Sequence, residues 1–458
     1  MAIFKPGFKG LGILFLASVV LAGCDNFKSS NELFKDGVQK GEKGDCQGAI
    51  TDFTKYIRLR PNSSAAYDNR GYAETKLGRL DEALVDFNLA LKLNPTNNLA
   101  IVHRAFVEFK MADFNRATSD VLRAIELNPS DGYAYLTMGD VSLKLKEWDN
   151  AIGYFTHAIR LQPKSGDAFA SRGEAKKHKG DYLGAITDYD QAITFEPTNK
   201  YFFSERGFVK LKIGDLDGAI ADYTAAIVSN PTNGLAYYDR ALARGRKSDF
   251  DGAIADFSKA IEISPTDSIA YDARASTWNK KGDSTKALAD YDQAIAIDSK
   301  DTRAFMGRGV VKTDRGDWSE AIKDYDQIIQ NQPTNSMAYN NRGWAKFQKS
   351  DFDGAIADAT TAIEINSTEG AAYGTRGWAR YGKGDANGAM IDCQRAIGLN
   401  GTNAAMVAYD EGLIDFIRSN YTQAVTSWQK VIDHYPQQKL QLQPWIEKAK
   451  DKLAVHAP

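Results

Sequence analysis

The residue types that most often do chemistry in proteins are spread along this 458-residue chain without forming a recognisable reaction centre. The five histidines never stand at the paired spacing that zinc ligands need, and no glycine-rich phosphate-binding loop occurs. Residues 249–252 and 351–354 both read Asp-Phe-Asp-Gly, like the start of a calcium-binding loop, but each lacks the third acid and the glutamate at the twelfth position. We expect these aspartates to cap helices instead. The sequence therefore predicts no enzyme activity, no cofactor and no metal site.

Cys24 is the residue whose surroundings predict covalent chemistry. Residues 1–23 combine a basic start with an apolar run, as a secretory signal peptide does, and the run is short for a membrane span. The ending Leu-Ala-Gly-Cys at 21–24 resembles a bacterial lipobox, which implies that the Cys24 thiol receives a diacylglycerol and that Cys24 begins the mature protein. The alternatives are an ordinary secretory signal or an uncleaved anchor, each with an incidental cysteine.

The resemblance to a lipobox also implies where the protein is found. Two or more acyl chains hold a protein stably on a bilayer, so we expect a lipid-anchored protein of the cell envelope that faces the periplasm. Asp25 and Asn26 resemble the signal that keeps lipoproteins of enteric bacteria in the inner membrane, which favours that membrane. The 57 basic and 59 acidic side chains nearly balance, and this argues against nucleic acid as a partner.

The rest of the chain is built from a repeat of 34 residues, seen most plainly in residues 200–233. A first helix is predicted at 201–213, ended by Gly214 in a left-handed conformation, and a second at 217–229, ended before Pro231. When each repeat is numbered so that Pro231 falls at position 32, proline recurs there in eight repeats, and alanine stands at position 20 in all twelve. The period and these residues resemble the tetratricopeptide repeat family.

This resemblance implies an all-α fold, a right-handed superhelical solenoid of about twelve helical hairpins with a C-terminal capping helix. A small residue at position 8, such as Gly207, is expected to face Ala219 at position 20 and let the two helices approach. Rings at positions 4 and 24, such as Phe203 and Tyr223, are expected to fill the space on either side. The predicted organisation is a signal peptide at 1–23, a lipidated tether at 24–29, twelve repeats at 30–438, and a cap at 439–458, its helix opened by Pro444 with Trp445, Ile446, Ala449 and Leu453 on one face.

Arginine at position 7 and aspartate at position 23 occur together in nine repeats. Where the arginine becomes Met138 the aspartate becomes Tyr154, and where it becomes Glu411 the aspartate becomes Ser427. This joint loss predicts an ion pair between the two helices of each hairpin, although duplication of repeats could also preserve both residues without contact. The predicted pairs are Arg70–Asp86, Arg104–Asp120, Arg172–Asp188, Arg206–Asp222, Arg240–Asp256, Arg274–Asp290, Arg308–Asp324, Arg342–Asp358 and Arg376–Asp392.

In the tetratricopeptide repeat family the first helices line a concave groove that binds partners, and two kinds of residue are expected there. Basic side chains occupy position 13 in seven consecutive repeats, before this position turns acidic at Asp314. Rings at positions 9 and 12 suit peptide ligands, but they could instead pack between neighbouring first helices, and the lysines could simply complement the helix dipole. The cluster of Trp344, Phe347, Trp378 and Tyr381 is the strongest candidate contact site. The other candidates are Tyr72, Phe106, Phe109 and Phe208, with Lys76, Lys110, Lys144, His178, Lys212, Arg246 and Lys280.

Two functions of different classes fit these features. The first is a membrane-anchored scaffold whose groove binds partner proteins or peptides of the envelope. The second is a glycan-binding module whose rings stack on peptidoglycan or another polysaccharide. Capture of a defined protein favours the first function, and sedimentation with purified cell wall favours the second.

Overall fold

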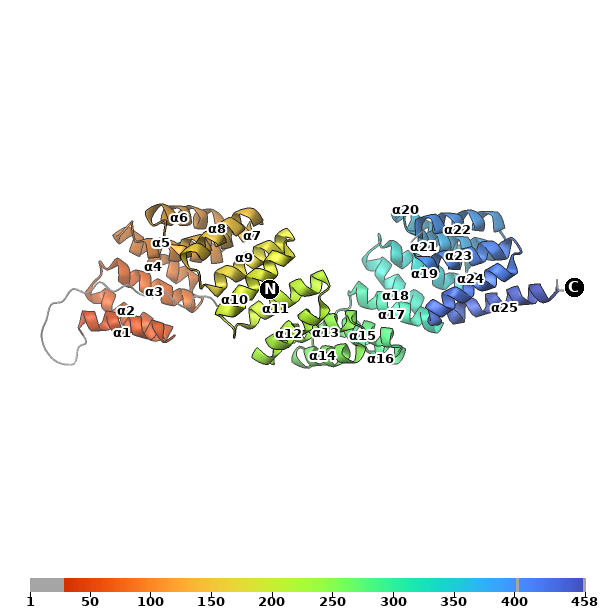
Figure 1. Ribbon diagram of the computed structural model, residues 1–458, viewed down its shortest axis with the longest axis horizontal. Helices are drawn as coiled ribbons and strands as arrows, with labels where there is room; N and C mark the ends of the chain where they lie inside the picture. The colour runs from red at the N-terminus through yellow and green to blue at the C-terminus, as the bar shows by residue number, and fades with distance from the viewer. Residues whose placement is uncertain (1–28, 401–402, 456–458) are drawn as a thin grey trace. The chain divides into compact units, whose positions relative to one another are not determined.

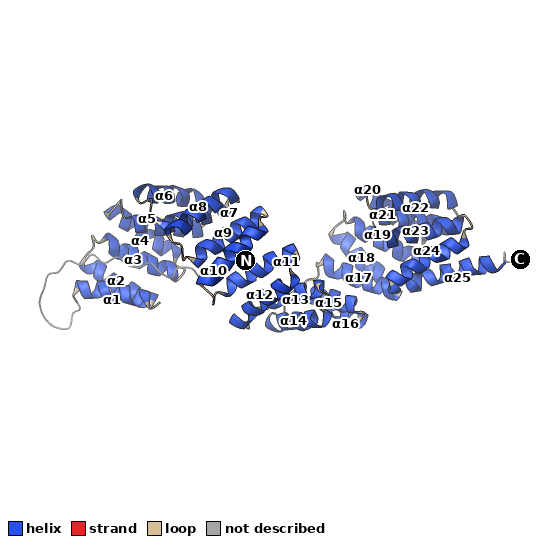
Figure 2. Cartoon of the chain, viewed as in Figure 1, coloured by secondary structure: helices blue, strands red, loops and turns tan. Residues whose placement is uncertain are grey.

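The computed structural model describes residues 29–400 and 403–455, and these residues form helices and no strands (Figures 1 and 2). Cys24 and the predicted signal peptide lie outside the described residues. The chain divides into two compact parts, one ending at Pro231 and the other beginning at Thr232. Within each part, consecutive helices pair as hairpins and each hairpin packs on the next. The fold is an all-α solenoid.

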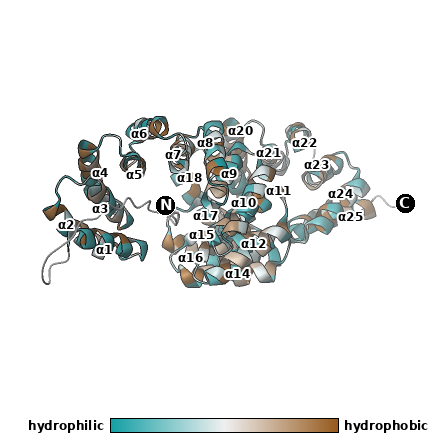
Figure 3. Cartoon of the chain, turned by 60° about the vertical axis from the view of Figure 1, so that its left-hand side comes forward, coloured by the Kyte–Doolittle hydropathy of each residue, from teal (hydrophilic) through white to brown (hydrophobic). Residues whose placement is uncertain are grey.

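Each of the twelve predicted repeats contains one hairpin in the described residues. Hydrophobic and hydrophilic residues share most of the helices (Figure 3), as expected of helices that pack on one side and face water on the other. The N-terminal part holds α1 (Ser30–Glu42), α2 (Cys46–Leu59), α3 (Ser64–Lys76), α4 (Leu80–Leu93), α5 (Asn98–Lys110), α6 (Phe114–Leu127), α7 (Gly132–Lys144), α8 (Trp148–Leu161), α9 (Gly166–Lys179), α10 (Tyr182–Phe195), α11 (Lys200–Ile213) and α12 (Leu216–Ser229). The C-terminal part holds α13 (Gly234–Arg246), α14 (Phe250–Ile263), α15 (Ser268–Lys281), α16 (Ser284–Ile297), α17 (Thr302–Arg315), α18 (Trp318–Asn331), α19 (Ser336–Gln348), α20 (Phe352–Ile365), α21 (Gly370–Gly382), α22 (Ala386–Asn400), α23 (Ala404–Ile417), α24 (Tyr421–His434), a 3₁₀ turn η1 (Pro436–Gln438) and α25 (Lys439–Val455).

Local sequence signals begin and end these helices. Asp249 and Asp351 accept hydrogen bonds from the backbone N–H groups of Gly252 and Gly354, at 3.0 Å in both cases, so they cap α14 and α20 as expected. Gly214 ends α11 at φ 85°, a conformation that glycine adopts without steric penalty. A side chain in the same conformation is strained. Such residues replace glycine at Ala112, Lys146, Ser248, Ser350 and Ser419.

The two helices of a hairpin meet where one of them has no side chain. A Cβ atom added to Gly207 would lie 3.2 Å from the ring of Tyr223, and one added to Gly139 would lie 2.4 Å from the ring of Phe155. The ring at position 24 therefore rests on the glycine at position 8, whereas the sequence placed it to one side. Ala219, like the other alanines at position 20, is fully buried. A larger residue at position 8 would force the helices apart.

In each of nine hairpins, an arginine of the first helix joins it to the second helix. In α11 and α12, Arg206 Nε donates to Asp222 Oδ2 at 2.9 Å and Nη2 donates to Oδ1 at 2.5 Å, which is the bidentate geometry of a strong pair. The same two hydrogen bonds connect the residues of every predicted pair, including Arg70–Asp86 and Arg308–Asp324. The structure thus brings each predicted pair together.

Eight of these arginines also donate to the preceding hairpin, a contact that was not predicted from the sequence. Arg206 Nη1 donates to Asp190 Oδ1 at 2.5 Å, and Arg308 Nη1 donates to Asp292 Oδ1 at 2.6 Å. The guanidinium of Arg206 also lies over the ring of Phe203 on its own helix, 5.7 Å from the centroid. One side chain therefore ties its own hairpin together and ties it to the hairpin before.

The last helix begins earlier than the sequence predicted. Helix α25 starts at Lys439 and contains Pro444, so the prediction that this proline opens the helix is wrong. Leu442 is completely buried, and burial of this side chain favours a helical turn before the proline, despite the backbone N–H that proline lacks. Ile446 is buried as expected, but Leu453 is exposed. The buried residues of α25 therefore lie closer to the N-terminus of the helix than the sequence predicted.

Candidate partner-binding site

Three of the predicted groove lysines lie over an aromatic ring one turn earlier on the same first helix. The Nζ atoms of Lys76, Lys110 and Lys212 lie 5.2, 5.1 and 5.2 Å from the ring centroids of Tyr72, Phe106 and Phe208, respectively. The three lysines are exposed, Tyr72 and Phe106 are half-buried, and Phe208 is 37% exposed. Each pair offers a cation and an apolar ring edge together, at α3, α5 and α11.

Some rings of the N-terminal part also pack between neighbouring first helices. Tyr72 lies 5.0 Å from the ring of His103 on α5, and Phe109 lies 6.1 Å from Phe114 at the start of α6. Tyr72 therefore packs between first helices, the alternative that the sequence left open, whereas Phe109 packs on the second helix of its own hairpin. Phe208 is the most exposed ring of this set.

The remaining basic positions lie in the last turns of α7, α9, α13 and α15 and are exposed. They are Lys144, His178, Arg246 and Lys280. His178 stacks on Trp148 with ring centroids 4.8 Å apart. Burial lowers the pKa of His178, so its imidazole is neutral at pH 7 and adds no charge.

The predicted aromatic contact patch is largely a core. Phe347 and Trp378 are buried, and Trp344 and Tyr381 are half-buried among them. The cause is α25, because its Trp445 packs 5.2 Å from Trp378 and 5.8 Å from Tyr381. Fewer of the four rings are therefore accessible to a partner than the sequence analysis expected.

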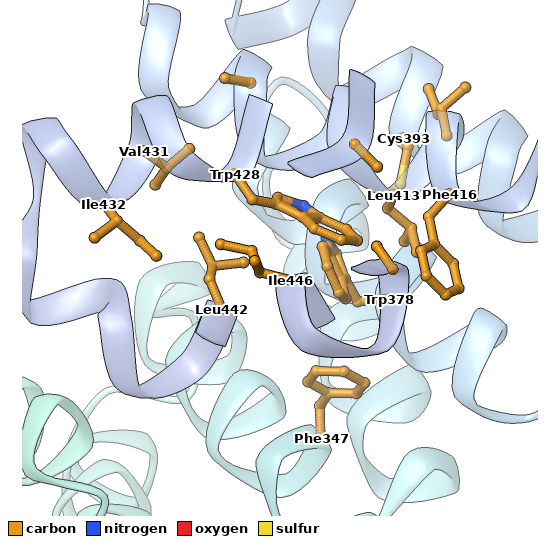
Figure 4. Packing of buried hydrophobic residues seen from close by; sticks show 14 of the residues in the cluster. Phe347, Trp378, Cys393, Leu413, Phe416, Trp428, Val431, Ile432, Leu442 and Ile446 are labelled. Atoms are coloured by element: carbon orange, nitrogen blue, oxygen red, sulfur yellow. The ribbon is translucent and has the colours of Figure 1, made fainter. Parts of the chain in front are cut away.

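Figure 4 shows how α25 completes this core. Leu442 and Ile446 point toward the ring of Trp428 on α24, with Trp378 beside it. The last helix therefore covers part of the surface on which a partner was expected from the sequence.

A cavity of about 490 Å³ remains open beside this core, in the C-terminal part. Residues of α17, α18, α19, α21, α23 and α24 line it, together with residues between Tyr435 and Gln441. Of the four predicted rings, Trp344 and Trp378 line it, together with Tyr409. We call this space the C-terminal cavity.

The charged or titratable acidic side chains that line the C-terminal cavity are those of Asp314 and Asp410. Asp410 on α23 is only 5% exposed, and burial raises its pKa to about 7, partly opposed by the side chain of Trp378. Burial also raises the pKa of Asp314 on α17 to about 6. None of the described residues that line the cavity is lysine, arginine or histidine. Its lining is thus acidic and aromatic.

The sequence analysis missed Tyr409, Asp410 and Gln441. They fall at positions 5 and 6 of the last repeat and in the cap, where no periodic pattern marks them. Only the residues next to Asp410 in the sequence could have indicated this site. This repeat has Glu411 where nine others have arginine, so Asp410 and Glu411 form an acidic pair without a basic neighbour in the sequence.

Two kinds of feature, metal-ligand groups and membrane-spanning helices, are absent from the part of the chain that the structure describes. No group of three histidine, cysteine, aspartate or glutamate side chains there could hold a metal ion. Among those same residues, no helix is both long and apolar enough to cross a membrane.

The repeats of this chain match models of a known protein family. Two family models described as tetratricopeptide repeat match the chain, one at residues 65–97 and the other at 136–200, 206–268, 280–336 and 311–370. An uncharacterised protein of Methanocaldococcus jannaschii is 39% identical over 58 residues, which are 13% of this chain and 67% of that protein.

Solved structures with a similar fold are more distant in sequence. A tetratricopeptide repeat protein from Parabacteroides merdae is 19% identical, with a TM-score of 0.45 over 55% of this chain and 98% of that one. YrrB, described as a tetratricopeptide repeat protein with an unusual peptide-binding site, is 22% identical, with a TM-score of 0.37 over 41% and 97%. Yeast Tom70 is 15% identical, with a TM-score of 0.40 over 93% and 97%. The repeat period, the paired helices and the matches of the family models show that this chain belongs to the tetratricopeptide repeat family.

Proposed function

We propose that this chain is a lipid-anchored scaffold of the bacterial cell envelope that binds partner proteins or peptides on the surface of its first helices. Tetratricopeptide repeat proteins generally mediate protein–protein interactions and are typically not enzymes. The anchor is supported by the lipobox-like Leu-Ala-Gly-Cys at 21–24, and Asp25 favours the inner membrane.

The lysine-over-ring pairs on first helices are the observation that supports partner binding most directly. In the pair of Phe208 and Lys212, an exposed ring and an exposed ammonium stand side by side on α11. A partner that places apolar and acidic side chains against them would gain both ring contact and charge attraction. Such a surface needs no catalytic group.

A crosslinking pull-down from membranes tests this proposal. The double variant Phe208→Ala with Lys212→Ala should lose a protein that the unchanged chain captures. A matched control on second helices, Leu183→Ala with Lys92→Ala, removes an exposed apolar side chain and an exposed lysine and should keep the capture. Equal capture by both double variants would contradict binding at this surface.

The glycan-binding alternative loses part of its support. It relied on exposed rings for stacking, but Phe347 is buried and Trp378 can be reached only from the C-terminal cavity. Sedimentation of the chain with purified cell wall, unaffected by added envelope protein, would nevertheless favour it over the scaffold.

A further inference from the structure

The C-terminal cavity has an aromatic wall made by three successive first helices. The ring centroids of Trp344 and Trp378 lie 6.4 Å apart, those of Trp344 and Tyr409 5.6 Å, and those of Trp378 and Tyr409 5.0 Å. All three residues line the cavity. Aromatic rings attract cations through their negative faces, and tryptophan does so most strongly.

Beside this wall lies a buried carboxylate without a cation. Asp410 Oδ1 lies 3.0 Å from the point where a Cβ atom of Gly374 would be, so the carboxyl rests on a backbone that has no side chain. Among the described residues, no lysine, arginine or histidine forms an ion pair with Asp410 or Asp314. Every aspartate at position 23 of the nine paired repeats, in contrast, holds an arginine. A buried carboxylate is costly unless it is paired.

The amide groups of the cavity add acceptors for N–H donors. Gln441 is 5% exposed and lines the cavity, and its Oε1 atom is buried without a hydrogen-bond partner. Asn340 Oδ1 accepts a hydrogen bond from Thr375 Oγ1 at 2.8 Å, and both residues also line the cavity. An unpaired buried acceptor is unusual in a folded protein and calls for a donor.

We propose that the C-terminal cavity receives the basic side chain of a partner peptide, with arginine as the best fit. A guanidinium has five N–H donors in one plane and stacks on aromatic rings, so it matches the rings, the carboxylate and the amide acceptor at once. The cavity, at about 490 Å³, also leaves space for the residues that flank the side chain. This inference rests on the proposed function and adds the chemistry of the partner.

Binding of a short peptide tests the proposal on the full chain labelled with fluorotryptophan. The probes are acetyl-Gly-Gly-Arg-Gly-Gly-amide and the same peptide with citrulline, which keeps the shape of arginine but has no charge. The arginine peptide should shift the ¹⁹F resonances of Trp344 and Trp378 in a saturable way. The citrulline peptide should bind at least tenfold more weakly, because hydrogen bonds to a charged group are the stronger kind. Equal binding of the two peptides, or no shift with either, would overturn the proposal.

Variants locate the binding within the cavity. Asp410→Asn keeps the size of the side chain and removes its charge, so it should weaken the arginine peptide about tenfold or more. Asp314→Asn serves as a second variant in case the first disturbs folding, and it should weaken binding in the same direction. Asp451→Asn, on the exposed side of α25, should leave binding unchanged. Unchanged binding by both cavity variants refutes the site.

Two further measurements separate the possible failures. If N-ethylguanidinium binds as tightly as the arginine peptide, the cavity takes a free organic cation and the peptide proposal is rejected. If the arginine peptide does not bind while the membrane pull-down still captures a protein through Phe208 and Lys212, the cavity proposal fails and the scaffold function stands.

Discussion

At the scale of single residues, the arginine–aspartate pairs differ in how many cations each aspartate holds. Asp222 accepts from Arg206 and also lies 2.9 Å from Lys210 Nζ. Asp290 accepts from Arg274, and the residue at the position of Lys210 in that repeat is Trp278. Loss of the arginine should therefore leave Asp222 with a second cation and Asp290 with none.

Arg274→Leu should accordingly destabilise the chain more than Arg206→Leu. Removing one partner of a buried pair costs about 3 kcal/mol when the other charge is left alone, and the cost for Arg206→Leu should be roughly 1 kcal/mol because Lys210 remains. Urea unfolding measures both changes. Adding Asp290→Leu to Arg274→Leu should recover much of the loss. Simple additivity of those two changes would show that the pair has no coupling.

The buried carboxyl of Asp410 predicts a dependence of stability on pH. In the folded chain it holds its proton up to about pH 7, whereas an unfolded aspartate loses it near pH 4. Between these values the folded state binds more protons, so its contribution to stability is complete below about pH 4 and is lost as pH rises through about 7. Asp410→Asn cannot ionise and should not lose this contribution.

Urea unfolding between pH 5 and pH 8 checks this expectation. Asp410→Asn should become more stable than the unchanged chain as pH rises, by on the order of 2 kcal/mol at pH 8. Asp451→Asn is the control and should follow the pH dependence of the unchanged chain. Parallel curves for the unchanged chain and Asp410→Asn would mean that the carboxyl is not held neutral.

At the scale of the helices, the ends follow from sequence more reliably than the contacts between distant segments do. The left-handed Gly214 and the caps at Asp249 and Asp351 depend on neighbours within a few residues, and all were predicted correctly. Burial of Trp378 depends on Trp445, 67 positions later, and the repeat pattern does not say which segment covers a ring. The C-terminal cavity, lined by residues of six helices and of the segment after α24, was unpredictable for the same reason.

Helix ends also offer a test of backbone strain. Ser248 ends α13 at φ 65°, where a side chain costs about 1 kcal/mol relative to glycine. Ser248→Gly should therefore raise the free energy of unfolding by roughly 0.5 kcal/mol after the entropy cost of glycine is subtracted. Ser229→Gly, in the last helical turn of α12, should lower it. A loss of stability for both variants would show that the strain at Ser248 is negligible.

Helix α25 should act as a structural cap for the last repeats. Ile446 is 1% exposed, so Ile446→Ala should cost about 2–4 kcal/mol in local stability. Hydrogen exchange measures where the loss falls. Amides of α23 and α24 should exchange faster while those of α3 and α4 do not change, because a repeat contacts only its neighbours. Glu447→Ala, on the exposed side, should change neither set.

At the scale of the whole molecule, the anchor should decide where the chain is found. Cys24→Ala removes the thiol that the lipobox-like sequence would acylate, and the described residues contain no membrane-spanning helix. The variant should therefore lack the lipid and escape the lipoprotein-specific processing, and mass spectrometry should find a diacylglycerol only on the unchanged chain. An unmodified Cys24 thiol in the native protein would contradict lipidation. Cys46→Ala is the control and should keep the protein on the membrane.

These arginines form hydrogen bonds both within their own hairpin and to the preceding hairpin. This pattern affects how such an array can change its length in evolution. Arg206 finds one partner in its own hairpin and another at Asp190 in the preceding hairpin, and Arg308 does the same with Asp324 and Asp292. A module that carries this arginine therefore also carries a side chain that joins it to the module before it, and nine of the twelve repeats have one. Gene duplication of such a module would leave no isolated arginine at the new junction. The array can lengthen to fit its partners without redesign of its joints.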